Sequence, residues 1–283
     1  MQAILPDAIT EDEFHRLLSQ YPSVVQDSGT GNQLFPLVPP CPNPSDSVAA
    51  KPGQPSLQAL DQLRYVDFPQ TFHPQRGTTM DQGHVEKLVE WKLRHGKFRP
   101  SLTKLIASND PVVTKSTIAA AVAAYRHAGT PQAVGPAVGQ LTRLKGVGPA
   151  TASLLLSVHD PRVIFFSDEA YWWLCCGGQR RAIRYNASEY ADLCSRATVL
   201  ADRLGVVDMA QVEKVAYVLL RRSKDPGKGA VETARRGKRA GEVAAGDAAR
   251  SGDAKGTRAG KRKTVDAGEG REAGLRRSKR QKG

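Results

Sequence analysis

Residues 141–156 have the sequence LTRLKGVGPATASLLL, in which two glycines flank one valine between two helix-forming segments. Glycine allows a positive φ and a close approach to the main chain, so Gly146 and Gly148 predict a sharp turn that exposes backbone N–H groups. We expect both glycines to adopt a positive φ and Val147 to point inward. Pro149 fits the first turn of a helix, where its missing N–H breaks no hydrogen bond. The second helix would then offer free N–H groups and its positive end to an anion.

The apolar residues around this turn support two packed helices. They are Leu141, Leu144, Val147, Ala152 and Leu155. Because this arrangement binds an anion without any charged side chain, the predicted ligand is a phosphate of a nucleic-acid backbone. A Gly-x-Gly turn can also do no more than join two packed helices, and this alternative stays open.

The stretch LKGVGPATASLLL resembles the hairpin of the helix-hairpin-helix DNA glycosylase superfamily, which includes endonuclease III and the adenine-mismatch glycosylases. Those proteins place an essential aspartate after the hairpin, and Asp168 follows Ala150 by 18 residues, a similar spacing. Across residues 80–222 only the general helical layout agrees. The resemblance implies that Asp168 is catalytic. It also implies DNA contacts at Leu144, Lys145, Gly146, Val147, Gly148, Ala150 and Thr151.

The departures from the family pattern limit the chemistry. Ala150 stands where bifunctional members carry a catalytic lysine, so strand cleavage through an imine at that position is excluded. Cys175, Cys176 and Cys194 do not supply the four spaced ligands of an iron–sulfur cluster. We therefore expect no resident cofactor, with a monovalent cation at the hairpin as the one ion that the resemblance allows. After Asp168 the chain has Glu-Ala where relatives have a Thr-His or similar pair.

Asp168 has two interpretations. In a glycosylase its carboxylate would stabilise an oxocarbenium-like sugar and help to activate water, after the target base has been flipped out of the duplex. The residues Ser167, Asp168 and Glu169 also form a good helix start, with a serine cap and acids at the positive end of the helix. Asp168 would then only stabilise that helix.

The remaining pattern predicts an all-α fold. Residues 56–222 show helical spacing in about seven to nine segments, with a Pro- and Gly-broken stretch up to about Gly77 and one candidate strand, Arg162–Phe166. We expect a glycosylase-like helical domain over residues 56–222, with the hairpin at 141–156. Residues 1–55 would form one short helix, starting with a capping box at Thr10, and a disordered Pro-rich linker. Within the basic and aromatic run after residue 90, we expect Trp91 and Phe98 to be core residues.

The positive charge belongs to the end of the chain. Of the net charge of +13, residues 221–283 carry +12, with 20 Lys and Arg against 8 Asp and Glu. Large apolar residues are nearly absent there, so residues 223–283 are expected to be a disordered tail. Two clusters in the tail resemble a bipartite nuclear import signal. They comprise Lys261, Arg262, Lys263, Arg276, Arg277, Lys279 and Arg280.

Together these features predict a nuclear DNA-binding protein that resembles a monofunctional glycosylase of base excision repair. The expected partners are double-stranded DNA, chromatin or repair proteins, and a nuclear import receptor, with no membrane. Whether the chain is an enzyme is left open. The alternative is a non-catalytic DNA-binding or chromatin-associated module that keeps the glycosylase fold. An excision assay with Asp168→Asn as the comparison separates the two.

Overall fold

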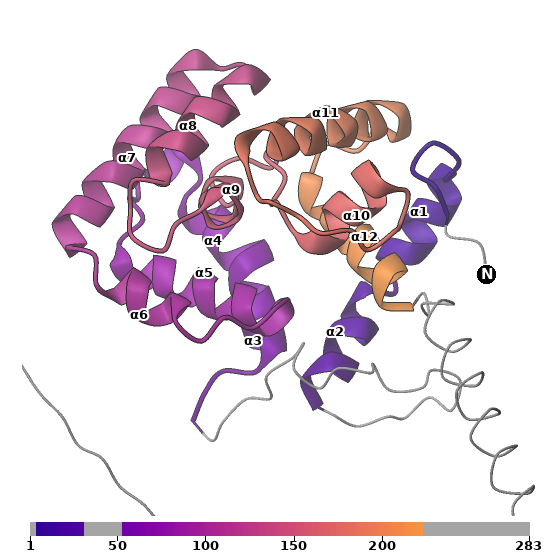
Figure 1. Ribbon diagram of the computed structural model, residues 1–283, viewed down its shortest axis with the longest axis horizontal. Coiled ribbons are helices and arrows are strands. Elements are labelled where there is room, and N and C mark those ends of the chain that lie inside the picture. Colours follow the sequence, from indigo (N-terminus) through magenta and orange to yellow (C-terminus); the bar gives the residue numbers. More distant parts are fainter. Residues whose placement is uncertain (1–3, 31–52, 223–283) are drawn as a thin grey trace, which may run out of the picture. The chain divides into compact units, whose positions relative to one another are not determined.

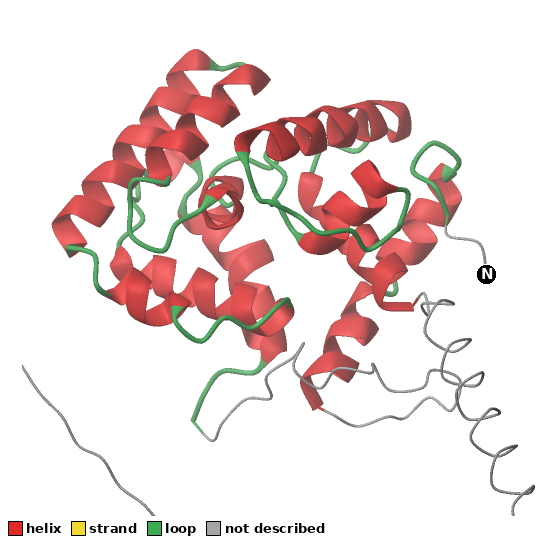
Figure 2. Ribbon diagram, viewed as in Figure 1, coloured by secondary structure: helices red, strands yellow, loops and turns green. Residues whose placement is uncertain are grey.

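The computed structural model describes residues 4–30 and 53–222, and every regular element in these two ranges is a helix (Figures 1 and 2). The α-helices of the N-terminal half are α1 (Glu11–Leu18), α2 (Tyr21–Thr30), α3 (Leu57–Gln62), α4 (Phe68–Thr71), α5 (Gln82–His95), α6 (Leu102–Ala107) and α7 (Pro111–Ala128). They are followed by α8 (Val134–Leu141), α9 (Pro149–Ser157), α10 (Asp168–Cys176), α11 (Ala187–Leu204) and α12 (Met209–Arg222). Short π or 3-10 segments are η1 (Leu63–Asp67), η2 (Pro74–Arg76) and η3 (Pro131–Ala133). The prediction of an all-α fold is confirmed for the described residues.

Side-chain caps fix where several helices begin. The Thr10 side chain accepts a hydrogen bond from the N–H of Glu13 at 3.3 Å. This is one of the two hydrogen bonds of the predicted capping box. Ser56 accepts one from the N–H of Ala59 at 3.0 Å. Each cap satisfies an N–H that the helix itself leaves without an acceptor. These helix starts are therefore encoded locally, by a residue and its neighbour three positions later.

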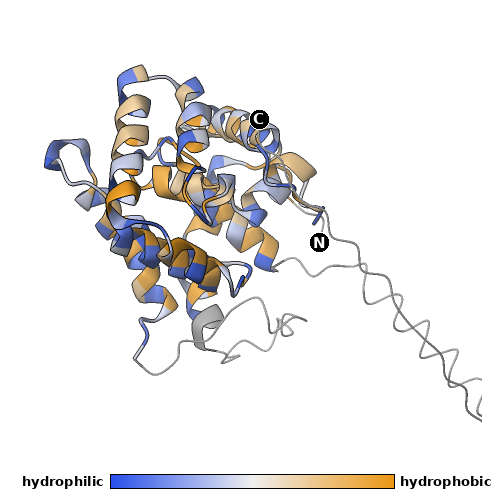
Figure 3. Cartoon of the chain, turned by 60° about the vertical axis from the view of Figure 1, so that its left-hand side comes forward, coloured by the Kyte–Doolittle hydropathy of each residue, from blue (hydrophilic) through white to orange (hydrophobic). Residues whose placement is uncertain are grey.

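The N-terminal helices belong to the same core as the rest of the described chain. Both α1 and α2 pack against α12, and Phe14, Leu17, Tyr21 and Val25 are buried (Figure 1). Residues 4–30 therefore belong to the same compact unit as residues 53–222. The cause is the amphipathic pattern of α1, whose apolar face needs a partner and finds it on the last helix. Figure 3 shows hydrophobic stretches gathered within the bundle and hydrophilic loops at its margin.

The candidate strand Arg162–Phe166 is an unpaired extended segment, so that prediction is wrong. Val163, Ile164, Phe165 and Phe166 are buried in it. Its main-chain groups bond to side chains instead of to a second strand. The Phe165 N–H donates to Oε1 of Glu213 at 2.7 Å, the Phe166 N–H donates to Oγ of Ser153 at 2.9 Å, and the Ile164 carbonyl accepts from the Tyr190 hydroxyl at 3.0 Å.

A buried ion pair joins η1 to α12 beneath this segment. Nη2 of Arg64 lies 3.4 Å from Oε2 of Glu213 and donates a 2.7 Å hydrogen bond to Oγ of Ser157. Both charged side chains are almost fully buried. Burial raises the pKa of the Glu213 carboxyl to about 7, although the Arg64 charge acts against this shift. The pair ties the first half of the bundle to the last helix.

Candidate functional site

The turn between α8 and α9 is anchored from inside. The two helices pack against each other, and Val147, at 4% exposure, points into the core as predicted. Leu141, Leu144, Ala152 and Leu155 are buried as well, which confirms the packing expected for them. Pro149 is the first residue of α9. The sequence therefore predicted the local geometry of this element correctly, apart from one of its glycines.

The two glycines of the turn differ in conformation. Gly146 has a φ of 77°, and a Cβ on it would lie 3.0 Å from Cβ of Leu105 in α6. Gly148 has φ −89° and ψ 179°, so the positive φ expected there is wrong. The reason is that Gly148 precedes Pro149, and a residue before proline favours an extended backbone. A Cβ on Gly148 would meet no atom within 4 Å.

The main-chain donors of the turn can be accounted for one by one. The N–H of Lys145 donates to Oδ1 of Asn109 at 2.8 Å, and that of Val147 donates to the Leu144 carbonyl at 3.1 Å. The N–H of Thr151 donates to the Gly148 carbonyl at 2.9 Å. The donors without an acceptor in the described part of the chain are the N–H groups of Gly146, Gly148 and Ala150.

Asn109, between α6 and α7, fixes this arrangement from outside the turn. Its side-chain carbonyl accepts from the Lys145 N–H, and its amide nitrogen donates to the Lys145 carbonyl at 2.9 Å. Both main-chain groups of one turn residue are therefore held by one side chain. The sequence analysis did not identify Asn109, because it lies 36 residues away and belongs to no periodic pattern.

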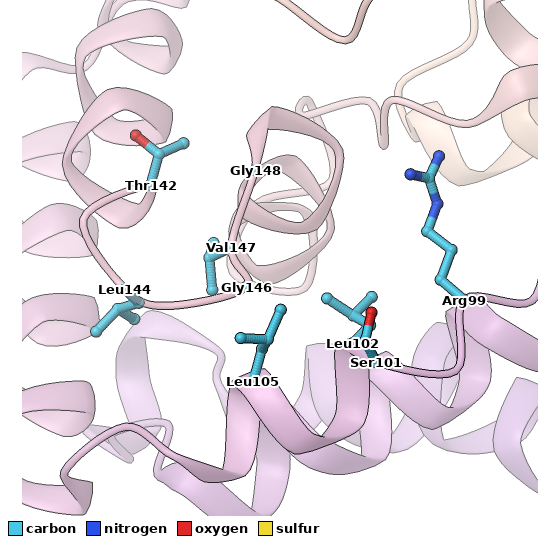
Figure 4. Close-up of a pocket in the computed structure, with 9 residues that line it drawn as sticks. All are labelled: Arg99, Ser101, Leu102, Leu105, Thr142, Leu144, Gly146, Val147 and Gly148. Carbon is cyan, nitrogen blue, oxygen red and sulfur yellow. The ribbon is translucent and has the colours of Figure 1, made fainter. Parts of the chain in front are cut away.

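An open depression of about 420 Å³ lies beside the turn (Figure 4). The residues that line it are Arg99, Ser101, Leu102, Leu105, Thr142, Leu144, Gly146, Val147 and Gly148. In Figure 4 the Leu102 and Leu105 side chains rise from α6 toward the turn, and Arg99 stands at one end with its guanidinium extended. The walls are thus mostly apolar or main chain, with one cation at the end.

The other predicted contact residues differ in their exposure and in whether their donors already have partners. Lys145 is exposed, whereas Leu144 and Thr151 are buried. Thr151, at 2% exposure, has both its N–H and its hydroxyl bonded within the protein, so it presents no free group to a ligand. Ala150 has a buried side chain, yet its N–H has no acceptor in the described chain. Among the described contact residues, Gly146, Gly148 and Ala150 therefore combine the predicted position with a main-chain N–H that has no acceptor.

Asp168 is separate from the cap of its helix. Oγ of Ser167 accepts the hydrogen bond from the Ala170 N–H at 3.1 Å, so serine performs the capping. The carboxylate of Asp168 is partly exposed and accepts a 2.6 Å hydrogen bond from the Tyr185 hydroxyl. Tyr185 has a φ of 55°, which is uncommon for a residue with a side chain, and its N–H donates to the Glu189 carboxylate at 2.8 Å. A strained loop residue thus holds the carboxylate.

Lys92 of α5 lies close enough to Asp168 for their charges to interact. Nζ of Lys92 donates a 2.8 Å hydrogen bond to Oγ1 of Thr151, the second residue after Pro149. Burial, together with the Arg99 charge, lowers the pKa of Lys92 to about 8, while the Asp168 charge acts in the opposite direction.

Arg99 connects this lysine to the depression. Its guanidinium lies 5.3 Å from the centre of the Tyr185 ring, and Arg99 also lines the depression. We call Lys92, Arg99, Thr151, Asp168 and Tyr185 the Lys92–Asp168 cluster. The cluster adjoins the α8–α9 turn through both Thr151 and Arg99.

The sequence analysis missed most of this cluster. One signal existed for Lys92, because it occupies the apolar stripe of Val85, Leu88 and Val89, where a cation is unexpected. No signal existed for Tyr185, whose role depends on a loop conformation. Trp91 is a core residue as expected, but Phe98 is 43% exposed, so its assignment to the core is wrong.

The two clusters of the import signal lie outside the described residues. Among the residues that the structure describes, no group of three or more His, Cys, Asp or Glu side chains is arranged to hold a metal ion. No helix in the described ranges has the length and apolar character needed to cross a membrane. Comparisons with protein-family models, with curated proteins and with solved structures found no match to this chain.

Proposed function

We propose that the protein binds the phosphate backbone of double-stranded DNA through the α8–α9 turn, as a helix-hairpin-helix protein of the DNA glycosylase type. The observation that carries the proposal is the set of three main-chain N–H groups, at Gly146, Gly148 and Ala150, that have no acceptor in the described chain. They belong to a turn in which Gly148 is exposed, Gly146 is half-buried and Ala150 is buried, and which leads into a helix N-terminus, where the helix dipole also favours an anion. The absence of a side chain at Gly148 lets a phosphate oxygen approach this main chain.

The catalytic part of the proposal concerns Asp168. Its carboxylate is partly exposed, is not used as a helix cap, and is linked through Tyr185 to Arg99, which lines the depression beside the turn. DNA held by the turn would bring a deoxyribose toward this carboxylate. There Asp168 would stabilise the positive charge that develops on the sugar as the base leaves, and would orient the attacking water. Ala150 cannot act as a nucleophile, so this part of the proposal is a monofunctional excision.

One observation favours the non-catalytic alternative. The 2.6 Å hydrogen bond from Tyr185 already engages one oxygen of Asp168. A carboxylate held in this way is well suited to fix the loop that contains Tyr185, and a protein that only binds DNA would keep such a bond for its structure. The excision assay described below separates this alternative from catalysis.

The binding proposal is tested with Gly148→Asp, in a chain that ends at Asp225 so that the basic tail does not bind DNA itself. The new carboxylate meets no protein atom near its Cβ and would face the bound phosphate, so affinity for a duplex should fall about tenfold or more. Gly135→Asp is the matched control, since Gly135 is an exposed glycine of α8 with equal free space. Fluorescence anisotropy measures both. Equal affinities of the two variants would contradict the proposal.

Catalysis is tested with duplexes that contain uracil, alkylated bases, oxidised bases or mismatches. We expect excision of one of these classes, and a loss of about 100-fold or more in Asp168→Asn, with binding retained. Binding by the wild-type protein without any excision would instead support the non-catalytic module.

A further inference from the structure

The loop between α10 and α11, residues 177–186, carries three arginines and no acidic residue. They are Arg180, Arg181 and Arg184, and all three are exposed. Residues 1–220 together carry a net charge of only +1, because acids offset nearly all of their cations. The loop is therefore a local concentration of positive charge on a nearly neutral domain.

Hydrogen bonds to α10 hold this loop in place. The Gly178 N–H donates to the Trp172 carbonyl at 2.8 Å, and Nε1 of Trp172 donates to the Arg181 carbonyl at 2.7 Å. Near the other end of the loop, the Tyr185 hydroxyl donates to the Asp168 carboxylate at 2.6 Å. Asp168 is the first residue of α10, so the loop leaves the end of this helix and returns to its start (Figure 1).

The three guanidinium groups of the loop differ in their partners. Nη2 of Arg180 donates to a main-chain carbonyl of α12 at 2.9 Å, so this group is already used within the protein. Nη2 of Arg181 donates to the neutral side-chain oxygen of Gln179 at 2.9 Å. Neither Arg181 nor Arg184 forms an ion pair with an acidic side chain of the described residues. Unneutralised, exposed cations of this kind are typical of a surface that binds a polyanion.

Arg99 connects these two arginines to the α8–α9 turn. Its guanidinium lies 5.3 Å from the centre of the Tyr185 ring, and Tyr185 directly follows Arg184. Arg99 also lines the depression beside the turn. We call Arg99, Arg184 and Arg181 the arginine row. It begins at the depression and continues on the loop beside α10, a helix of nine residues and about 13 Å.

We propose that the arginine row binds phosphates of the same DNA duplex that the turn holds, and so fixes the direction in which the DNA leaves the turn. This inference rests on the proposed function, because the turn must supply the first phosphate contact. It adds to that site a second surface, made of charged side chains instead of main-chain N–H groups. DNA that follows the row passes Asp168, which is bonded to the residue after Arg184.

The two surfaces differ in how their contacts respond to salt. A main-chain N–H carries no net charge, whereas an arginine that neutralises a phosphate releases condensed counterions when the complex forms. The row should therefore contribute more than the turn to the salt dependence of DNA affinity. Each phosphate contact contributes about 0.9 to the slope of log affinity against log salt, so the loss of two contacts should reduce that slope by about 2.

The test measures the affinity of the full chain for a short duplex by fluorescence anisotropy at several salt concentrations. Because the basic tail is the same in every variant, its contribution cancels in the comparison. Arg181→Gln combined with Arg184→Gln should lower affinity about tenfold at low salt and reduce the slope by about 2. The matched control is Arg76→Gln combined with Arg196→Gln, which removes two exposed arginines outside the row and should change both quantities far less.

The outcomes separate this inference from the proposed function. Equal affinities and slopes in the loop variant and the control would overturn the inference, and would indicate an acidic protein as the partner of the loop. If Gly148→Asp binds more weakly than Gly135→Asp while the loop variant matches its control, the inference alone is wrong. If Gly148→Asp and Gly135→Asp bind equally, the proposed function is wrong, and the inference, which needs both contacts on one duplex, is wrong with it.

Discussion

At the scale of single residues, Gly146 and Gly148 show that neighbouring glycines can be required for different reasons. Gly146 is favoured by the fold, because residues with a side chain rarely adopt its φ of 77° and a Cβ would lie only 3.0 Å from Cβ of Leu105. Gly148 has an ordinary extended backbone and open space around it. Folding therefore does not require a glycine here, and under the proposed function its lack of a side chain serves the approach of a phosphate.

This contrast gives a stability prediction. Gly146→Ala should lower the free energy of unfolding by about 1–3 kcal/mol, because alanine at this φ is strained and its Cβ crowds α6. Gly148→Ala should change it by no more than about 0.5 kcal/mol. Urea denaturation of both variants measures the difference. Similar losses in the two variants would show that the backbone conformations assigned to these glycines are wrong.

At the scale of elements, the helices with local signals are the ones that the sequence predicts well. The caps at Thr10 and Ser56 lie within three residues of the N–H groups that they satisfy. Arg162–Phe166 is not a strand because its main-chain groups form hydrogen bonds with the side chains of Ser153, Tyr190 and Glu213. These side chains come from three different helices. A buried extended segment of this kind has the composition of a strand, and only the tertiary fold distinguishes the two.

The ion pair between Arg64 and Glu213 gives a prediction at this scale. Arg64→Met should lower the free energy of unfolding by about 3–5 kcal/mol near pH 8, because it leaves Glu213 as a buried charge without its partner. At pH 5 the loss should be smaller, since burial raises the pKa of Glu213 to about 7 and the carboxyl can take up a proton. Denaturation at the two pH values measures this.

The matched control for that prediction is the double variant Arg64→Met with Glu213→Gln. Glutamine keeps an acceptor for the Phe165 N–H, which Oε1 of Glu213 now accepts at 2.7 Å, and carries no charge. The pH dependence should disappear in the double variant. A single variant that is equally unstable at both pH values would show that lost packing, not the buried charge, sets the cost.

At the scale of the whole molecule, buried histidines oppose folding in acid. Burial and the nearby Arg126 charge lower the pKa of His159 to about 4, from an ordinary value of 6.5. Between these two values the unfolded chain binds the proton and the folded chain does not. Stability should therefore fall as the pH decreases from 6.5 to 4, by at most about 3 kcal/mol for this residue.

His159→Leu should flatten the acid side of the stability profile, and His127→Leu should not, because His127 is exposed. Melting temperatures between pH 4 and 7 give the two slopes. Glu213 acts in the opposite direction over part of this range, so the comparison of variants, not the wild-type curve, isolates His159. Parallel curves for the wild type and His159→Leu would contradict the assignment.

The candidate site shows where prediction from sequence ends. The turn is encoded in 16 consecutive residues, 141–156, so spacing alone indicated its packing and its donors. The groups around it come from distant segments: Lys92 and Thr151 are 59 positions apart, and Asp168 and Tyr185 are 17 positions apart. No periodic pattern links such residues. Lys92 and Thr151 become neighbours only because α5 packs on α9, and Tyr185 reaches Asp168 only because the loop after α10 turns back toward the start of that helix.

The clamp formed by Asn109 has a consequence for how the turn meets a ligand. By forming hydrogen bonds with both main-chain groups of Lys145, the Asn109 side chain restrains the α8–α9 turn in the protein without a ligand. Under the proposed function, a phosphate would meet a turn whose conformation is already fixed, so little ordering entropy would be lost on association. Replacing Asn109 with a residue of shorter side chain should therefore mainly shorten the lifetime of such a complex, because a more mobile turn would release the phosphate sooner.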